Sequence, residues 1–382
     1  MEKKEAMLGF VTMGVALQGW NRTQMAAQVA AGKLDGVAAG PASPFTDKLH
    51  KGHRKGCKKM TSTFRAACAL LTTVVFLGIA VCGDARAAET IIIGTASPGG
   101  PYLAYGKGLA RILSRELRQE VTAESTQGPA QNITLLEKKQ MMLAFTTIGV
   151  ALQAWNGADW TKGERYRSMR VIFPMYDTAF QFVALKRLGL RWLEDFAGLR
   201  IGVGPRAGTG GTYVPEILNA LGIKASVRFG AMESMGAQLT TGDLDGVVFA
   251  TGFPVPVLTT LISAHPVDFV RPSPDQIAII RQKLPEISQS LVPAQTYPTQ
   301  ERDYPTIGLY NFAVAHKDLP NDLVYQIVKA VFDNHDELVK AQSSANETVP
   351  ANISRDAVLP LHPGAERYYR EVGIPIPVEQ TH

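Results

Sequence analysis

Two glycine-rich segments hold the residues best suited to bind a charged ligand. The first reads Gly94-Thr-Ala-Ser-Pro-Gly-Gly-Pro-Tyr102, and the second reads Gly202-Val-Gly-Pro-Arg-Ala-Gly-Thr-Gly-Gly-Thr212. Glycine lets a ligand come close to the backbone, and the first free N–H groups of a following helix carry partial positive charge. Each segment therefore suits a carboxylate or a phosphate, although a tight strand-to-helix connection without a ligand would explain either one alone.

Other chemistry at these segments has weaker support. Gly106-Lys107 is followed by Gly108, so it is not a P-loop, and neither segment spells a dinucleotide-binding Gly-x-Gly-x-x-Gly with a ribose-binding acid after it. A serine hydrolase is the main alternative, because Thr95-Ala-Ser97-Pro-Gly99 misses Gly-x-Ser-x-Gly by one residue. The histidines that could complete a triad in chain order are His265, His316, His335 and His362. No two of them have the spacing of metal ligands on one helix, so we expect neither a metal nor a cofactor.

The elements that must position these two segments are predicted to be strands that alternate with helices along the chain. The predicted strands cover residues 91–93, 121–123, 142–145, 171–173, 180–185, 200–203, 227–229 and 247–250. The predicted helices include residues 103–117, 213–221, 233–241 and one long amphipathic helix over 321–341. This alternation indicates parallel sheets that are covered on both faces. We therefore expect two open α/β sheets with a cleft between them.

Composition separates the first 87 residues from the rest. The chain has 39 Lys and Arg against 34 Asp and Glu, a net charge of +5. Residues 1–87 hold 12 of the basic and 5 of the acidic residues, which leaves 27 and 29, or −2, in residues 88–382. All three cysteines, Cys57, Cys68 and Cys82, also lie in the first part. Residues 88–382 therefore lack the excess of positive charge that nucleic-acid binding requires. Since they contain no cysteine, they can form no disulfide, thiol nucleophile or cysteine-ligated metal site.

An export signal lies inside the chain. Basic residues flank Met60, residues 66–82 are apolar, and Ala85-Arg86-Ala87 places small residues where a signal peptidase reads them. We expect residues 60–87 to be a signal peptide that is cleaved near Ala87, which makes the mature protein periplasmic. The alternative is a retained membrane anchor, although an apolar run of this length is at the lower limit for a bilayer span.

The first 59 residues repeat two separate pieces of the later sequence. Residues 7–21 match residues 142–156 at 11 of 15 positions, and residues 25–37 match residues 235–247 at 8 of 13. The two offsets differ, so this is not a solenoid repeat. Our hypothesis is that residues 1–59 are a spurious or vestigial extension from an internally deleted gene copy, and that translation starts at Met60.

A set of ordered short motifs resembles a known family. They lie at residues 93–102, 124–132, 203–211, 242–247, 252–256, 297–300 and 361–369. With these motifs the chain is similar to the TAXI-type solute-binding proteins of TRAP transporters, which are extracytoplasmic receptors that deliver small organic acids to a membrane permease. The motifs run through nearly the whole mature chain.

The resemblance implies a periplasmic-binding-protein type II fold, in which two α/β lobes with open sheets and flanking helices close on a ligand about a hinge. The first lobe would combine residues 88–178 with 289–382, and the second would be residues 179–288. The implied ligand is a dicarboxylate, a 2-oxo acid or an amino acid such as glutamate, and the implied partners are the TRAP membrane subunits. A sensor that presents its ligand to a membrane kinase is an alternative with the same fold. We expect a monomeric mature protein that binds no nucleic acid and is not an enzyme.

Carried over by position, the resemblance implies ligand-binding residues in both lobes. Hydroxyl and amide groups can orient a ligand, and an arginine can pair bidentately with a carboxylate. The implied residues are Thr95, Ser97, Gly100, Tyr102, Ser125, Thr126 and Asn132 in the first lobe, Arg206, Thr209, Gly210 and Thr212 in the second, and Tyr176 and Gly252 near the crossover. An exposed loop arginine without a ligand remains the alternative for Arg206.

Three departures from the family pattern lie at or near the expected cleft. Residues 101–103 read Pro-Tyr-Leu where a second tyrosine is common, and the second glycine-rich segment is one residue longer, with Ala207 inserted. Residues 147–149 read Thr-Ile-Gly where many members carry Gln-Ser-Asp. These differences bear on the identity of the ligand more than on the fold.

Overall fold

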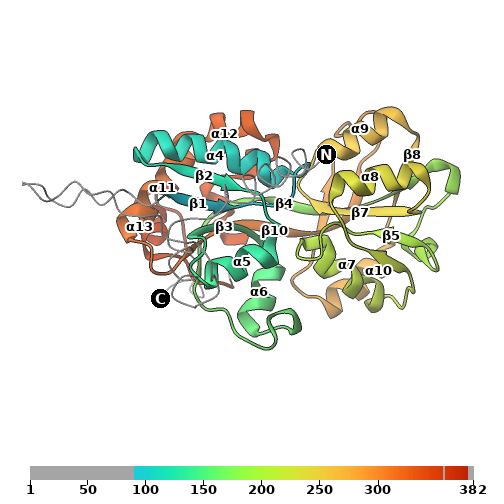
Figure 1. Ribbon diagram of the computed structural model, residues 1–382, viewed down its shortest axis with the longest axis horizontal. Coiled ribbons are helices and arrows are strands. Elements are labelled where there is room, and N and C mark those ends of the chain that lie inside the picture. The colour runs from blue at the N-terminus through green and yellow to red at the C-terminus, as the bar shows by residue number, and fades with distance from the viewer. Residues whose placement is uncertain (1–89, 356–357, 377–382) are drawn as a thin grey trace, which may run out of the picture. The chain divides into compact units, whose positions relative to one another are not determined.

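A curled mixed β-sheet runs through the protein in the computed structural model, which describes residues 90–355 and 358–376 (Figure 1). The strands in this part of the chain are β1 (Ile91–Gly94), β2 (Val121–Glu124), β3 (Leu143–Thr147), β4 (Met169–Leu185), β5 (Arg200–Gly202), β6 (Ser226–Arg228), β7 (Gly246–Thr251), β8 (Val267–Val270), β9 (Ser288–Val292) and β10 (Tyr304–His316). Their order is β2-β1-β3-β10-β4-β7-β5-β6, while β8 pairs with β4 and β9 with β10.

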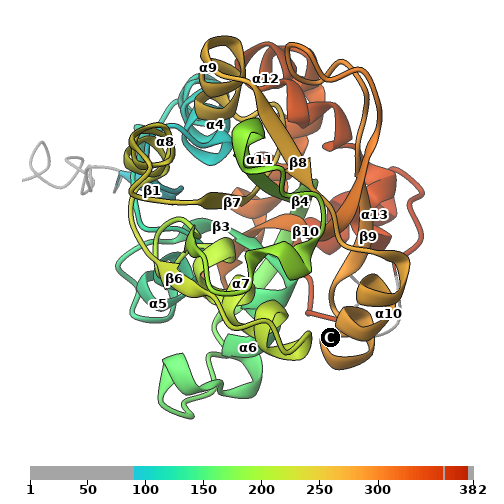
Figure 2. The same ribbon diagram turned by 90° about the vertical axis from the view of Figure 1, so that its right-hand side faces the viewer.

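Helices cover both faces of this sheet. They are α4 (Pro101–Leu117), α5 (Pro129–Glu137), α6 (Ile148–Asn156), α7 (Thr209–Ala220), α8 (Met232–Thr241), α9 (Pro256–Ala264), α10 (Pro274–Lys283), α11 (Asn321–Asp333), α12 (His335–Ala341) and α13 (Pro363–Glu371). Short 3-10 turns cover Asp159–Thr161, Lys186–Leu188, Leu193–Phe196, Ser343–Glu347 and Pro350–Arg355. In Figures 1 and 2, α8 and α9 lie on one side of β7 and α7 lies on the other.

Two βαβαβ units give the sheet its pattern. In the first unit, β1 lies between β2 and β3 and pairs with both in parallel; in the second, β5 lies between β6 and β7 in the same way. Each glycine-rich segment follows the central strand of its unit, β1 or β5. Because ligands of open α/β sheets bind outside the carboxyl ends of the strands, this placement aims both segments at the same kind of site.

Two long antiparallel strands connect the units. β4 has 17 residues, which span about 55 Å when extended, and pairs with β10 along its first part and with β7 and β8 along its second. Its side chains are buried almost throughout, with Phe173 and Phe180 fully inaccessible. β4 and β10 thus lie between the two units and join them: β10 pairs with β3 of the first unit, and β4 pairs with β7 of the second.

The α/β prediction is confirmed, with two differences in detail. The predicted strands 171–173 and 180–185 are parts of the single strand β4. Pro174 lies at a register shift between β4 and β10, the kind of irregularity that lets a sheet hold a proline. The strands within each unit pair in parallel, as predicted. The two predicted open sheets are, however, parts of one hydrogen-bonded sheet, because β4 and β10 join them by antiparallel pairing.

The predicted long helix 321–341 is divided at Asn334. This residue leaves the helical conformation, with φ −114° and ψ 28°, and its side-chain amide donates to the carbonyl oxygen of Ala330 at 2.9 Å. The same carbonyl accepts the backbone N–H of Asn334 at 3.2 Å, so the side chain adds a second bond at the end of α11, and α12 starts at the next residue. Local bonds of this kind favour asparagine at the ends of helices rather than in their interiors.

The predictions for residues 1–59 and for the signal peptide over 60–87 lie outside the described residues. Residues 90–355 and 358–376 belong to the unit that spans Asp84–His382. Within these residues, no helix combines the length and the apolar character that crossing a membrane requires.

Candidate functional site

A pocket lies where the two βαβαβ units face each other. Its lining comes from the two glycine-rich segments, from the turn after β2, and from the facing side chains of β4 and β7. The turn after β1 contributes Ser97 and Gly100, and the turn after β5 contributes Gly204 and Gly208. Both glycine-rich segments therefore line one pocket.

Four helices begin at this pocket. α4 and α5 contribute Tyr102 and Pro129 from their first turns, while α7 and α8 contribute Thr209 and Met232. None of the four has a side-chain cap at its N-terminus. In the described structure the first turns of α4, α7 and α8 leave N–H groups free, whereas in α5 the first residue is Pro129 and the Ala130 N–H donates to the carbonyl of Ala207. The positive ends of all four helix dipoles point toward one region, which suits an anion.

The pocket-lining side chains in the described part of the chain carry no charge. Any stabilisation of an anionic ligand must therefore come from backbone N–H groups and neutral hydrogen-bond donors. The pocket is also narrow, since the centre of a water molecule can occupy about 40 Å³ of it. That is room for roughly three waters, so a larger ligand requires the walls to move apart.

Four of the predicted residues build the first turn and are not part of the lining. The hydroxyl of Thr95 donates to the carbonyl of Glu124 at 2.6 Å, and that of Ser125 donates to the carbonyl of Ala96 at 3.0 Å. The buried Asn132 donates its amide hydrogens to the carbonyls of residues 94, 95 and 145.

Thr126 completes this arrangement. Its hydroxyl lies 2.7 Å from the side-chain oxygen of Asn132 and accepts a hydrogen bond from the N–H of Gly128 at 3.0 Å. Thr95, Ser125, Thr126 and Asn132 thus fix the turns after β1 and β2 relative to each other, and direct ligand contact by them stays a prediction.

Ser97, Gly100 and Tyr102 are the predicted first-segment residues that do line the pocket. Tyr102 is buried, and burial raises the pKa of its hydroxyl well above the usual value of 10. The Tyr102 hydroxyl donates to the side-chain oxygen of Asn311 on β10 at 2.5 Å. It is therefore neutral and held in one orientation at physiological pH.

Of the four residues predicted in the second segment, two line the pocket and two do not. Thr209 and Gly210 line it. Arg206 is exposed, and its guanidinium lies 3.9 Å from the centroid of the Phe229 ring. The hydroxyl of Thr212 donates to the carbonyl of Gly208 at 3.0 Å, within the first turn of α7. The structure therefore places Arg206 and Thr212 beside the pocket but outside its lining.

Tyr176 and Gly252 contact each other behind the pocket. Tyr176 is fully buried and stacks edge-on against Tyr102, at 6.3 Å between ring centroids. A Cβ on Gly252 would lie 2.5 Å from the Tyr176 ring, so this close approach requires glycine. In the described structure the Tyr176 hydroxyl has no hydrogen-bond partner.

Several lining residues were not singled out from the sequence. They are Ala96, Gln127, Gly128, Pro129, Thr178, Val203, Gly204, Pro205, Gly208, Met232, Val248, Ala250 and Thr251. Asn311 does not line the pocket, but its side-chain oxygen accepts hydrogen bonds from the lining residues Tyr102 and Thr178. The sequence offers one indication of its role, because Asn311 is a polar residue inside an otherwise apolar run of β10. Thr178 is a similar polar residue on β4, in the stretch between the predicted strands 171–173 and 180–185.

None of the four candidate histidines lines the pocket with Ser97 in the described residues. His316 Nδ1 accepts from the N–H of Asp318 at 3.1 Å, and burial lowers the pKa of this imidazole. His335 Nε2 lies 2.8 Å from the carbonyl of Ala345, and His362 caps α13. No group of three or more His, Cys, Asp or Glu side chains in residues 90–355 and 358–376 is arranged to hold a metal ion.

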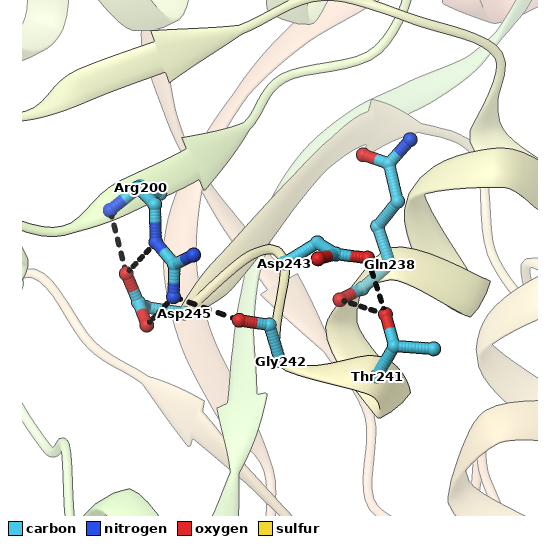
Figure 3. Close-up of polar contacts among 6 residues, drawn as sticks. All are labelled: Arg200, Gln238, Thr241, Gly242, Asp243 and Asp245. Atoms are coloured by element: carbon cyan, nitrogen blue, oxygen red, sulfur yellow. Dashed lines mark hydrogen bonds and ion pairs between the residues drawn. The ribbon is translucent and has the colours of Figure 1, made fainter.

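The motif at residues 242–247 has a structural role (Figure 3). Arg200 at the start of β5 donates to Asp245 with Nε at 2.9 Å and Nη2 at 2.8 Å, and its own N–H also reaches this carboxylate at 2.9 Å. Nη2 further donates to the carbonyl of Gly242 at 2.7 Å. These bonds clamp the turn between α8 and β7 onto β5, which is away from the pocket lining.

Comparison with known proteins places the chain in a family. The family described as NMT1-like matches residues 93–373. Among solved structures, the chain is similar to MatC from Rhodopseudomonas palustris with bound malate, at 13% identity over 74% of this chain and 96% of that one, with a TM-score of 0.48. It is also similar to PhnD1 from Prochlorococcus marinus with methylphosphonate, at 14% identity over 74% and 98%, with a TM-score of 0.44.

Proposed function

The chain belongs to the NMT1-like family, and on this premise we propose that it is a solute receptor that binds a small organic acid and delivers it to a membrane transporter. The observation that carries the proposal is the pocket at which α4, α5, α7 and α8 all begin. A carboxylate there would receive hydrogen bonds from free backbone N–H groups and lie at the positive ends of four helices.

In this proposal two lobes close around the ligand. The first lobe combines residues 88–178 with 289–382, the second is residues 179–288, and β4 and β10 are the hinge between them. Ligand contacts from both lobes would favour the closed arrangement, because hinge closure couples such contacts to a change of global shape. The transporter could then distinguish the loaded from the unloaded receptor.

The finer assignments rest on the sequence motifs. We propose that the partner is a TRAP permease of the TAXI type, that the mature protein is periplasmic and monomeric, and that Ser97, Gly100, Tyr102, Thr209 and Gly210 contact the ligand. Arg206 has a smaller part in this scheme, since its guanidinium stacks on Phe229. The charge of the ligand is instead balanced by the helix N-termini.

Thermal unfolding with a library of carboxylic acids tests the proposal. A ligand that binds only the folded protein stabilises it by RT ln(1 + [L]/Kd), so about 3 kcal/mol is expected at a hundredfold excess over Kd. Native mass spectrometry of protein purified without refolding would identify a co-purified acid directly. The absence of any shift across the library, together with esterase turnover that is lost in Ser97→Ala, would instead support a hydrolase.

A further inference from the structure

Asn311 determines the hydrogen-bonding character of one wall of the pocket. It is fully buried on β10, and its Nδ2 donates to the carbonyl oxygen of Tyr176 at 2.6 Å. A backbone carbonyl can only accept, so the amide group must point its nitrogen toward Tyr176 and its oxygen the other way. The orientation of the Asn311 side chain is therefore fixed.

The Asn311 oxygen faces two hydroxyl groups that belong to the pocket lining. The hydroxyl of Tyr102 lies 2.5 Å from it and that of Thr178 lies 2.8 Å from it. Since this oxygen can only accept, both hydroxyls must donate, and each has only one hydrogen. Burial keeps the pKa of Tyr102 well above its usual value, so its hydrogen stays in place. The oxygens of Tyr102 and Thr178 can therefore only accept a hydrogen bond from a ligand.

The other polar groups of the pocket behave differently. The helix N-termini offer N–H groups, which can only donate. The hydroxyls of Ser97, Thr209 and Thr251 form no hydrogen bond with other described residues, so each can donate or accept. Thr209 and Thr251 are nevertheless only 5% and 8% exposed. The pocket thus combines a donor-rich side, at the helix starts, with an acceptor-only pair at Tyr102 and Thr178.

We propose that the ligand is a small hydroxy acid, whose carboxylate lies at the helix N-termini and whose hydroxyl group donates to Tyr102 or Thr178. This inference rests on the proposed function as an organic-acid receptor. A 2-oxo acid offers only hydrogen-bond acceptors. Its carbonyl oxygen would face the hydroxyl oxygens of Tyr102 and Thr178, and acceptors buried against one another without a donor are unfavourable. An amino acid has donors, but its ammonium group would enter a pocket whose described lining includes no carboxylate.

Matched ligands on one carbon skeleton test the inference with the wild-type protein. We would measure Kd by calorimetry for 2-hydroxyglutarate, 2-oxoglutarate, glutarate and glutamate, and for lactate, pyruvate, propionate and alanine. The expected result is that, in at least one series, the hydroxy acid binds at least about tenfold more tightly than each of the other three, the effect of one well-placed hydrogen bond in a buried site.

The outcomes separate the two levels of the proposal. Binding of acids with no preference for the hydroxyl group, or tightest binding of an oxo or amino acid, would overturn the hydroxy-acid assignment and leave the receptor function standing. Failure of every acid to bind, in these series and in the library above, would overturn both.

Variants identify the groups that create the preference. In Tyr102→Phe, we expect the hydroxy-to-oxo affinity ratio to fall to about threefold or less, because one acceptor is lost. Tyr105→Phe is the matched control: Tyr105 lies on the same helix, is also buried, and bonds to Thr348 at 3.0 Å outside the pocket. An unchanged ratio in Tyr102→Phe would contradict the role of this hydroxyl.

A second pair of variants guards against misfolding of Tyr102→Phe. Thr178→Val removes the other acceptor and should also lower the ratio. Thr306→Val is its control, because Thr306 is buried and donates to the carbonyl of Phe180 at 2.6 Å without lining the pocket. If both Tyr102→Phe and Thr178→Val fold and keep the full preference for the hydroxy acid, the inference is wrong.

Discussion

The backbone N–H of Ala130 donates a hydrogen bond of 3.0 Å to the carbonyl oxygen of Ala207. Ala130 lies in the first turn of α5, where a helix has no acceptor of its own for this group. Ala207 lies in the second glycine-rich segment, just before α7. Its carbonyl thus provides a bond between the turns that follow β2 and β5, and this bond lies beside the pocket.

Glycines allow this close approach. A Cβ on Gly128 would lie 3.0 Å from the Cα of Gly208. A Cβ on Gly208 would lie 3.2 Å from the carbonyl oxygen of Pro205 and 3.5 Å from that of Gln127, so the two further methyl groups of valine would exceed the space between the turns. We expect Gly208→Val to hold the two turns apart and to weaken ligand binding about tenfold, because overpacking of this kind costs about 1–3 kcal/mol. Calorimetry with the ligand found for the wild type would measure the change.

Gly230→Val is the control for this substitution. A Cβ on Gly230 would meet only the end of the flexible Met235 side chain, at 3.5 Å. Hydrogen exchange gives a second readout, since the Ala130 amide should be less protected in Gly208→Val than in the wild type. Equal affinity in the two variants would show that contact between the turns does not contribute to binding.

Thr209 and Thr212 allow a test of which α7 hydroxyl contacts the ligand. Both lie in the first turn of this helix, but Thr209 lines the pocket while Thr212 bonds to Gly208. We expect Thr209→Val to raise Kd about tenfold and Thr212→Val to change it much less. The reverse order of effects would favour the position-based prediction for Thr212 over the geometry. Thermal unfolding of both variants would show whether either loses stability.

Asp177 on β4 should make stability depend on pH. Burial raises the pKa of this carboxyl from 3.8 to about 6, although it accepts a hydrogen bond from Ser290. The folded protein therefore binds this proton more tightly than the unfolded chain. The contribution of Asp177 is fully favourable below pH 3.8 and is lost as the pH rises through about 6, at a cost of at most about 3 kcal/mol.

Asp177→Asn removes this titration. Between pH 4 and pH 7 the carboxyl of Asp177 loses its proton in the wild type, which lowers the free energy of unfolding, whereas the asparagine of the variant cannot titrate. We therefore expect the difference in unfolding free energy, variant minus wild type, to increase over this range. Urea denaturation at several pH values would measure it. A difference that is constant over this range would show that the Asp177 pKa is not raised in the folded state.

Asp245 should show the opposite sign. Hydrogen bonds from Arg200 lower the pKa of this carboxyl, so its contribution is present above the pKa of about 4 in the unfolded chain and is lost as the pH falls further. We expect Asp245→Asn to lower the Tm at pH 7 by about 1–3 °C, since partly exposed ion pairs contribute little. The deficit should shrink in acid.

Asp243→Asn is a control in the same turn (Figure 3). Asp243 accepts a hydrogen bond from Thr241 at 2.7 Å but does not contact Arg200. Its substitution should leave ligand affinity unchanged and change the Tm less than Asp245→Asn does. A larger effect for Asp243 would show that the clamp on β5 is not what stabilises this turn.

Local patterns were enough to predict many of the elements. The β-branched run before Gly94 and the apolar spacing after Leu103 correspond to β1 and α4. The glycines after β5 indicate a following helix, although α7 begins at Thr209, four residues before the predicted start at residue 213. These features depend on backbone preferences within a few residues, so they can be read without knowledge of the fold. The same holds for the two glycine-rich turns as candidate binding segments.

The roles of individual side chains depended on contacts between distant residues. Thr95 and Ser97 are two residues apart in the same turn, yet the first hydroxyl bonds to Glu124 and the second faces the pocket. Asn311 is 209 residues from Tyr102 and fixes the orientation of its hydroxyl. No local pattern encodes such pairings, because the first arises only when β1 lies beside β2 and the second only when the start of α4 meets β10.

The sequence by itself thus determined the α/β class and the two strand-to-helix turns, and it predicts that these turns prefer an anion, since backbone geometry and helix dipoles act locally. The tertiary structure decided that these turns meet, that Arg206 stacks on Phe229 while Thr178 and Thr251 enter the pocket, and that Tyr102 and Thr178 can only accept. The physical reason is that hydrogen bonds and packing join residues by distance in space, which the order of residues along the chain does not specify.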